Sequence, residues 1–123
     1  MANILLAEDD KSMSGFLEMA LTKAGHAVTC KNDGLEALKE LETKPNHYAL
    51  LLTDIVMPGM DGIELSQKAT EQYPDLKVMF ITGFAAVAVG HKDMDMNSSK
   101  TKLLSKPFHL NDLVDQIETL LAA

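Results

Sequence analysis

The sequence predicts an α/β fold in which strands and helices alternate around a parallel sheet. Short apolar runs typical of strands alternate with longer segments whose apolar residues recur at helical spacing. This alternation indicates βαβ units with right-handed crossovers, and hence a doubly wound (βα)5 arrangement. The run from Tyr48 to Thr53 is apolar enough to be buried on both faces, as in a sheet covered by helices. The 123 residues fit one domain spanning 1–123.

The first half of the chain holds three expected strands and two expected helices. The strands lie at 3–7, 27–30 and 49–53, and the helices at about 12–23 and from Gly34 up to Pro45. Phe16 and Leu35 are among the apolar residues that recur at helical spacing in these helices. We expect Gly25 to end the first helix and Pro45 the second, because glycine is common just after a helix and proline cannot continue one.

The second half continues the alternation, with one irregular segment. Further strands are expected at 77–82 and 102–105, and helices at about 62–72 and 110–121. Between Gly83 and Thr101 the chain is apolar only at 84–89, and Gly90 then interrupts the pattern. We therefore expect a short or mobile helix there, followed by a polar loop.

Composition disfavours nucleic acids and membranes as partners. The net charge is −7, and the chain has no arginine, the preferred side chain for phosphate and guanine contacts. Tryptophan is absent as well, which argues against a base-stacking surface. No apolar run reaches the ~18 residues of a membrane span, and the start lacks the basic segment of a signal peptide. The single Cys30 suits a reducing compartment, so we expect a cytoplasmic protein.

Histidine and methionine residues are expected to have structural roles. The four histidines are scattered over turns and helix ends without metal-ligand spacing. Surface or capping roles are therefore expected for His26, His47, His91 and His109. Met19 and Met79 are expected to fill the core.

Polar residues stand at the ends of four expected strands. Glu8 and Asp9 follow the first strand, and Asp54 follows the apolar run that ends at Thr53. Thr82 ends a later strand, and Lys106 follows the last one. In parallel sheets, ligands bind just beyond the carboxyl ends of the strands. We therefore expect these side chains to converge at one edge of the sheet.

The acidic residues at this edge are expected to bind a cation, because carboxylates brought together repel one another. A set of oxygen ligands suits Mg²⁺. We expect Asp9 and Asp54 to ligate directly, Glu8 to act through water, and the main-chain carbonyl of Val56 to supply another oxygen. An alternative is that the acidic run merely caps the following helix, and Asp10 or Ser12 is expected to have that role alone.

Asp54 is expected to act as a nucleophile toward phosphorus and to form an acyl phosphate. Lys106 would neutralise charge on the phosphoryl oxygens, and Thr82 would donate a hydrogen bond to one of them. A lysine before a proline is most often only a surface residue. The interpretation of Lys106 therefore depends on the other four positions.

The ordered set of motifs resembles the receiver domain of bacterial two-component response regulators over the whole chain. The set comprises Glu8-Asp9, Asp54, the segment Met-Pro-Gly-Met-Asp-Gly at 57–62, Thr82 and Lys106-Pro107-Phe108. The resemblance implies a flavodoxin-like three-layer sandwich with five parallel strands in the order 2-1-3-4-5. It also implies Mg²⁺ as cofactor, phosphotransfer to Asp54 from a histidine kinase or histidine phosphotransfer protein, and a cis peptide bond before Pro107.

Two features depart from the pattern of many receivers. Leu103 stands where these carry an aromatic residue that turns inward during switching, so we expect signalling to rely on the segment from Gly83 to Thr101. The positions that flank the attacking water in the family hold Val56 and Phe84. Apolar side chains cannot orient water by hydrogen bonds, so we hypothesise slow loss of the phosphoryl group.

The expected function is that of a phosphorylation-controlled binding module, not an enzyme acting on other substrates. Segments 82–86 and 106–110 are similar to those of CpdR-like single-domain regulators of α-proteobacteria. That similarity implies priming of the ClpXP protease, through its ClpX unfoldase, by the unphosphorylated form. One alternative is a phosphorelay intermediate without its own output. Another is a metal-dependent phosphohydrolase, disfavoured because Val56 occupies the place of a second acid–base residue.

Overall fold

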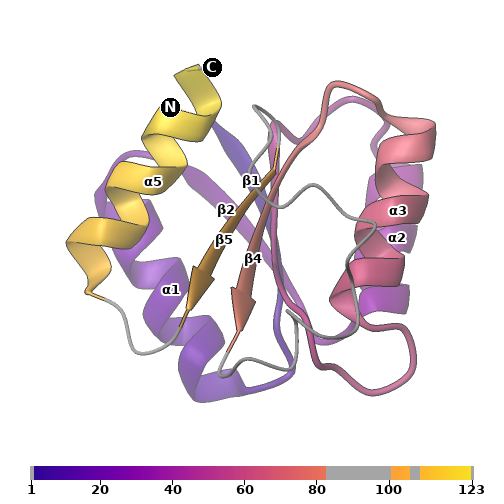
Figure 1. Ribbon diagram of the computed structural model, residues 1–123, viewed down its shortest axis with the longest axis horizontal. Helices are drawn as coiled ribbons and strands as arrows, with labels where there is room; N and C mark the ends of the chain where they lie inside the picture. The colour runs from indigo at the N-terminus through magenta and orange to yellow at the C-terminus, as the bar shows by residue number, and fades with distance from the viewer. Residues whose placement is uncertain (1, 83–100, 106–108, 123) are drawn as a thin grey trace.

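A parallel sheet flanked by helices forms the centre of the computed structural model (Figure 1). The structure describes residues 2–82, 101–105 and 109–122, with Thr82 and 101–105 described by their backbone. The strands are β1 (Asn3–Ala7), β2 (Ala27–Lys31), β3 (Leu50–Asp54), β4 (Lys77–Thr82) and β5 (Thr101–Ser105). The described helices are α1 (Lys11–Lys23), α2 (Gly34–Thr43), α3 (Gly62–Gln72) and α5 (Leu110–Ala122). The predicted bounds differ from these by two residues at most.

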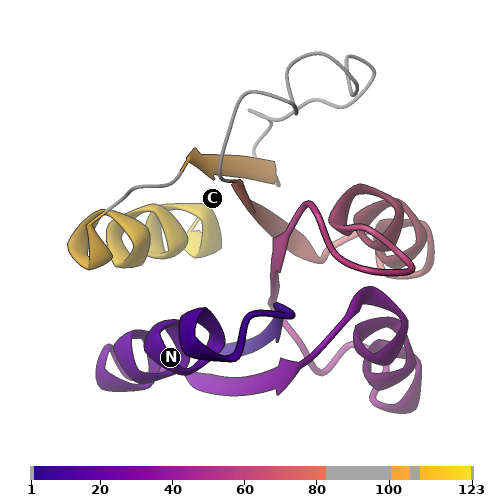
Figure 2. The same cartoon turned by 90° about the horizontal axis from the view of Figure 1, so that it is seen from below.

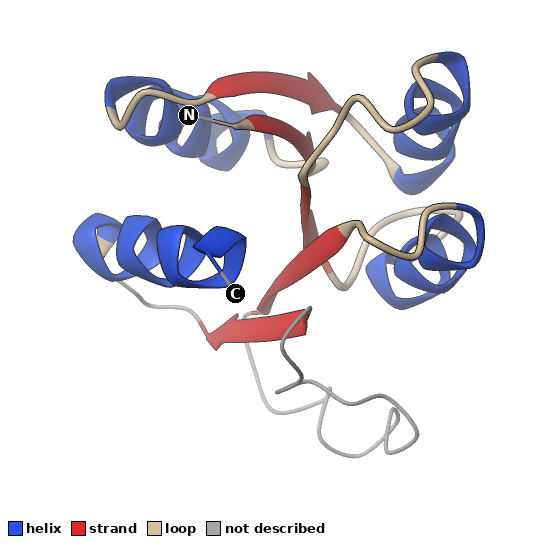
Figure 3. Ribbon diagram, turned by 90° about the horizontal axis from the view of Figure 1, so that it is seen from above, coloured by secondary structure: helices blue, strands red, loops and turns tan. Residues whose placement is uncertain are grey.

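The sheet has the strand order β2-β1-β3-β4-β5, with parallel pairing throughout. Helices α1 and α5 cover one face of the sheet, and α2 and α3 cover the other (Figures 2 and 3). The prediction of a flavodoxin-like, doubly wound three-layer fold is therefore confirmed. The short helix and polar loop expected between Gly83 and Thr101 lie outside the described residues, apart from the first residue of β5.

The core has two parts, one on each face of the sheet. The central strand β3 contributes to both, because Leu51 packs toward α2 and α3 while Leu50 and Leu52 pack toward α1 and α5. All three leucines are completely buried, as expected for a strand covered on both faces. This packing holds the carboxyl end of β3, and with it Asp54, at a defined place on the sheet edge.

Three aspartates begin three of the described helices. Asp10 accepts hydrogen bonds from the amides of the first turn of α1, at 2.9 Å from Ser12 and 3.2 Å from Met13. Asp33 and Asp61 cap α2 and α3 in the same way. These caps satisfy amides that have no partner inside the helix, and they place negative charge at the positive end of the helix dipole.

The prediction of core residues from apolar spacing was wrong for part of the core. Phe16 and Met19 on α1 and Leu35 on α2 are exposed, whereas Met79 on β4 is completely buried. The expectation that Met19 fills the core was therefore wrong, and that for Met79 is confirmed. Helical spacing identifies a stripe of apolar residues, but only the packing against the sheet decides which side of a wide stripe is covered.

A hydrogen-bonded group joins α2 to the segment that leads into β3. The Tyr48 hydroxyl donates to Oε2 of Glu40 at 2.5 Å, and the ammonium groups of Lys44 and Lys31 lie 3.3 Å and 3.8 Å from the Glu40 carboxylate. The Glu40 side chain is only 12% exposed. The bond from Tyr48 has the largest effect on the pKa of Glu40 and lowers it; burial opposes this effect, and the two lysines lower the pKa further.

We expect Tyr48→Phe to lower the free energy of unfolding by about 1.5 kcal/mol near neutral pH, the low end of the usual contribution of a hydrogen bond to a charged group. The pKa of Glu40 is lowered in the folded state, so its stabilisation is present above the unfolded-state pKa and is lost as pH falls through the folded-state pKa. The difference between wild type and Tyr48→Phe should therefore shrink below about pH 4. Urea unfolding at several pH values measures it, and a difference that grows toward acid would contradict this account.

Candidate functional site

The carboxyl ends of β1 and β3 bring the predicted acidic residues together. The two strands are adjacent, with Ala7 paired with Thr53, so the residues that follow Ala7 lie beside Asp54. Glu8 continues the path of β1, since its amide donates to the carbonyl of Lys31 at 3.1 Å. The expected convergence at one sheet edge is observed for these acids.

Glu8, Asp9 and Asp54 form a compact group of carboxylates. Each offers one oxygen, and the three oxygens lie within 4.8 Å of one another. Glu8 is buried, Asp54 is half-buried and Asp9 is exposed, so the group opens from the protein interior toward solvent. Carboxylates this close repel one another unless a cation or protons offset their charge. An open set of acidic oxygens fits Mg²⁺, which keeps several of its own waters.

The acidic run after β1 divides its roles between capping and the carboxylate group. Asp10 is the N-cap of α1, as predicted. Glu8 turns inward, is only 1% exposed, and accepts a hydrogen bond from the Asp10 amide through Oε2 at 3.2 Å. The alternative that the whole run only caps α1 therefore holds for Asp10 alone.

The loop between β3 and α3 is tied to β4, and a further bond joins its two ends. The Ile55 amide donates to the carbonyl of Ile81 on β4 at 3.3 Å, and the Gly62 amide donates to the carbonyl of Ile55 at 2.8 Å. The Thr53 hydroxyl is fully buried and donates to the main-chain carbonyl of Asp54 at 2.8 Å. These bonds hold the backbone on either side of the Asp54 carboxylate.

Val56 follows Asp54 by two residues, and its side chain is 63% exposed. The side chain is thus directed away from the core. An apolar group there provides no acid or base next to Asp54.

Sequence reasoning missed two glycines that shape this region. Gly34 and Gly62 are buried first residues of α2 and α3. A methyl group on Gly62 would overlap the carbonyl oxygen of Asp54, so only glycine permits this approach of α3 to the end of β3. The signal was present as two Asp-Gly pairs at helix starts, where an unfavourable helix former needs a packing reason.

The remaining predicted site residues are described in part or not at all. The Thr82 backbone ends β4 and pairs with Ser105 at the end of β5, one position beyond the pairing of Ile81 with Asp54. Leu103 lies on β5, which is described by its backbone. Phe84, Lys106 and Pro107, with the expected cis peptide bond, lie outside the described residues.

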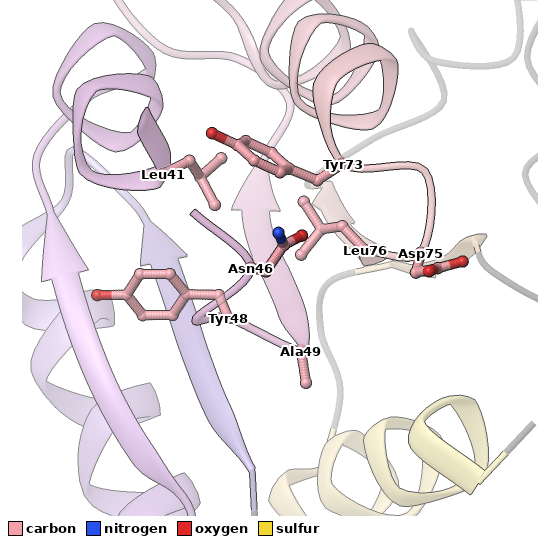
Figure 4. A pocket seen from close by; sticks show the side chains of 7 residues that line it. All are labelled: Leu41, Asn46, Tyr48, Ala49, Tyr73, Asp75 and Leu76. Atoms are coloured by element: carbon pink, nitrogen blue, oxygen red, sulfur yellow. The ribbon is translucent and has the colours of Figure 1, made fainter. Parts of the chain in front are cut away.

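A pocket of about 380 Å³ lies away from the carboxylates (Figure 4). Its lining includes Ala49 and Leu76, which immediately precede β3 and β4. The pocket is therefore at the amino ends of these strands, opposite the end that carries Asp54. The close-up shows Tyr73 and Leu41 across from Leu76 and Asn46.

His26 differs from the expected surface role. It is 7% exposed, and its Nδ1 accepts a hydrogen bond from the Ala2 amide at 3.1 Å. Its Nε2 lies 3.9 Å from a carboxylate oxygen of Glu118 on α5. His26 therefore anchors the chain ahead of β1, a structural role inside the fold.

Among the residues that the structure describes, no helix has the length and apolar character needed to cross a bilayer.

Comparisons with known proteins all find one kind of domain. A family model described as the response regulator receiver domain matches residues 4–118. The response regulator receiver protein CpdR of Brucella abortus is 58% identical over 123 residues, covering 100% of this chain and 99% of CpdR. The sensor kinase CckA of Brucella abortus is 31% identical, covering 98% of this chain and 12% of CckA. The structure of the response regulator TrrA of Thermotoga maritima, in complex with Mg²⁺ and BeF, is 25% identical with a TM-score of 0.82, covering 98% of this chain and 99% of TrrA.

Proposed function

The chain belongs to the family of response regulator receiver domains, and we propose that Asp54 is the residue that accepts its phosphoryl group. The observation that carries this proposal is the group of Glu8, Asp9 and Asp54, whose oxygens lie within 4.8 Å of one another at the end of β3. Asp54 is half-buried, so its carboxylate is both accessible to a phosphodonor and held by the sheet.

Asp9, Asp54 and the main-chain carbonyl of Val56 would hold Mg²⁺, with Glu8 acting through water. The bound ion would neutralise negative charge on the phosphoryl oxygens. A carboxylate oxygen of Asp54 attacks the phosphorus of a phosphohistidine whose ring carries a proton on its other nitrogen. The P–N bond breaks, its electron pair stays on the ring nitrogen, and the side chain leaves as a neutral imidazole. The product is an acyl phosphate on Asp54. We propose that Thr82 and Lys106 contact its phosphoryl oxygens, as the family resemblance implies.

The chain is a two-component response regulator domain and not a conventional enzyme. A histidine kinase is the partner that a receiver domain implies. A role in hydrolysing small phosphate esters is not supported, because the exposed Val56 supplies no acid or base beside Asp54.

For the output, we propose that the unphosphorylated form binds ClpX and primes the ClpXP protease. The support is the similarity to CpdR, which extends over 99% of the length of that protein at 58% identity. Phosphorylation of Asp54 would then weaken ClpX binding, since it converts a carboxylate of charge −1 into an acyl phosphate of about −2 and changes the surface that a partner meets. A relay intermediate, passing phosphate between histidines, is the alternative.

One experiment separates these outputs. The chain is phosphorylated with an autophosphorylated histidine kinase, and the affinity of purified ClpX for each form is measured by fluorescence anisotropy of the labelled chain. We expect the unphosphorylated form to bind on the order of tenfold more tightly, the coupling of about 1.4 kcal/mol usual for such switches. Equal affinity of both forms would contradict the adaptor role. Absence of ClpX binding together with rapid transfer to a histidine phosphotransfer protein would favour the relay.

A further inference from the structure

Gly34, the first residue of α2, is a glycine that its backbone conformation does not require. Among the described glycines, positive φ angles occur at Gly25 and Gly59 only. Gly34 follows the cap residue Asp33, and the Glu36 amide bonds to the Asp33 carboxylate at 2.9 Å. Any residue could adopt this conformation, and most would favour the helix more. The reason for glycine at position 34 must therefore be space.

The space at Gly34 is filled by the loop that follows Asp54. A Cβ atom on Gly34 would lie 2.5 Å from the carbonyl oxygen and 3.1 Å from the Cβ of Met60. The nearest atom belongs to the main chain, so a side-chain rotation at Met60 cannot relieve the overlap. The loop itself would have to move.

At its other end, the same loop is fixed against Asp54. Asp61 caps α3 by accepting from the Glu64 amide at 2.8 Å, and the Gly62 amide bonds to the Ile55 carbonyl at 2.8 Å. The missing side chain of Gly62 also allows the Asp54 carbonyl to approach. Residues 55–61 are thus held between the start of α2 and the end of β3.

Side chains support this contact as well, because Met57 is buried in the same core cluster as Ala37 and Leu38 of α2, and Met60 packs against that cluster. A pocket of about 310 Å³ separates the start of α2 from the loop, and its lining residues are Asp33, Leu35, Pro58, Gly59, Met60 and Glu64. Close backbone packing at Gly34 is therefore the contact that sets how near the Met60 carbonyl lies to the start of α2.

We propose that Gly34 is a positioning residue for the Asp54 site. Because Gly34 has no side chain, the start of α2 can pack against the loop and fix the position of residues 55–61. These residues include Val56, whose carbonyl would face Mg²⁺. The proposal rests on the proposed function of Asp54 and deepens it. It adds α2, whose residues lie outside the carboxylate group, to the elements that determine metal binding and phosphorylation.

The test is Gly34→Ala, with two measurements on the folded protein. Isothermal titration with MgCl₂ should show an affinity lower by on the order of tenfold, the low end of the loss seen when residues that orient metal ligands are changed. Hydrogen exchange in metal-free protein should become faster at the Gly62 amide, because its bond to Ile55 lies in the displaced loop. Unchanged values in both measurements would overturn the proposal.

Two control variants separate positioning from general destabilisation. Gly15→Ala places a methyl group on α1 where no neighbouring atom lies within 4 Å, so the affinity for Mg²⁺ should be unchanged. Ala37→Gly destabilises α2 at a buried position and adds no atom beside the Met60 carbonyl. An equal loss of Mg²⁺ affinity in Ala37→Gly would show that Gly34 acts only through stability, which overturns the proposal.

Two further outcomes are distinguishable. If wild type binds no Mg²⁺, the proposed function fails, and the exchange rate of the Gly62 amide alone decides whether Gly34 positions the loop. If Gly34→Ala does not fold, the pair Gly34→Ala and Met60→Gly gives the loop the freedom to turn its carbonyl away. The same two measurements then apply to the pair, with the same expected results.

Discussion

Replacing Asp54 with alanine is expected to abolish phosphorylation of the chain by acetyl phosphate in the presence of Mg²⁺. Wild type should gain one phosphoryl group by intact-mass spectrometry, and Asp54→Ala none. The physical reason is the placement of Asp54, which is half-buried and held at the end of β3, whereas Glu8 is almost completely buried and Asp9 is exposed and not part of a strand. Removal of the nucleophile leaves the donor without an acceptor in the proposed geometry.

The control for this prediction is Asp75→Ala. Asp75 is exposed and lines the pocket at the opposite end of the sheet, so its removal should leave the mass gain unchanged (Figure 4). A persistent gain in Asp54→Ala would assign the phosphoryl group to another acid, with the exposed Asp9 as the first candidate. No gain in wild type would mean that this receiver domain works without phosphate.

Asp9→Asn is expected to stabilise the metal-free protein and to remove most of its response to Mg²⁺. Three carboxylate oxygens within 4.8 Å repel one another, so neutralising the exposed one should raise the free energy of unfolding by about 1 kcal/mol. The same change removes a proposed ligand. Phosphorylation by acetyl phosphate at fixed Mg²⁺ should fall on the order of 10²-fold, equivalent to about 2.7 kcal/mol of charge stabilisation.

Urea unfolding with and without MgCl₂ checks the first part. Wild type should gain about 2.7 kcal/mol when free Mg²⁺ is 100 times its dissociation constant, and Asp9→Asn should gain far less at the same concentration. The control is Asp10→Asn, which also removes one negative charge but keeps a good cap on α1. An equal loss of the Mg²⁺ response in Asp10→Asn would show that overall charge, and not ligation by Asp9, is responsible.

Helix starts and strand ends were predictable from the sequence because local chemistry sets them. Asp10, Asp33 and Asp61 satisfy amides within three residues of themselves, and Gly25 takes a positive φ just after α1. Such signals involve neighbours in the chain. The alternation of strands and helices then limited the topology to a parallel sheet with helices on both faces.

The environment of individual side chains was less predictable. Phe16 matches the helical spacing of the core yet is exposed. His26 follows a helix end, where a surface role was expected, yet it is buried. Each outcome depends on what packs against the residue from elsewhere in the chain. His26, for example, is covered where the chain ahead of β1 meets α5, as its contacts with Ala2 and Glu118 show.

The sequence by itself determined the order of the elements and the presence of acids at the ends of β1 and β3, because periodicity, caps and turn residues are properties of neighbouring positions. Only the tertiary structure decided that the oxygens of Glu8, Asp9 and Asp54 lie within 4.8 Å of one another. Only it showed that Gly34 leaves room for the Met60 carbonyl. Both facts depend on crossovers that bring distant segments together, and the distances between such segments are set by packing across the whole sheet.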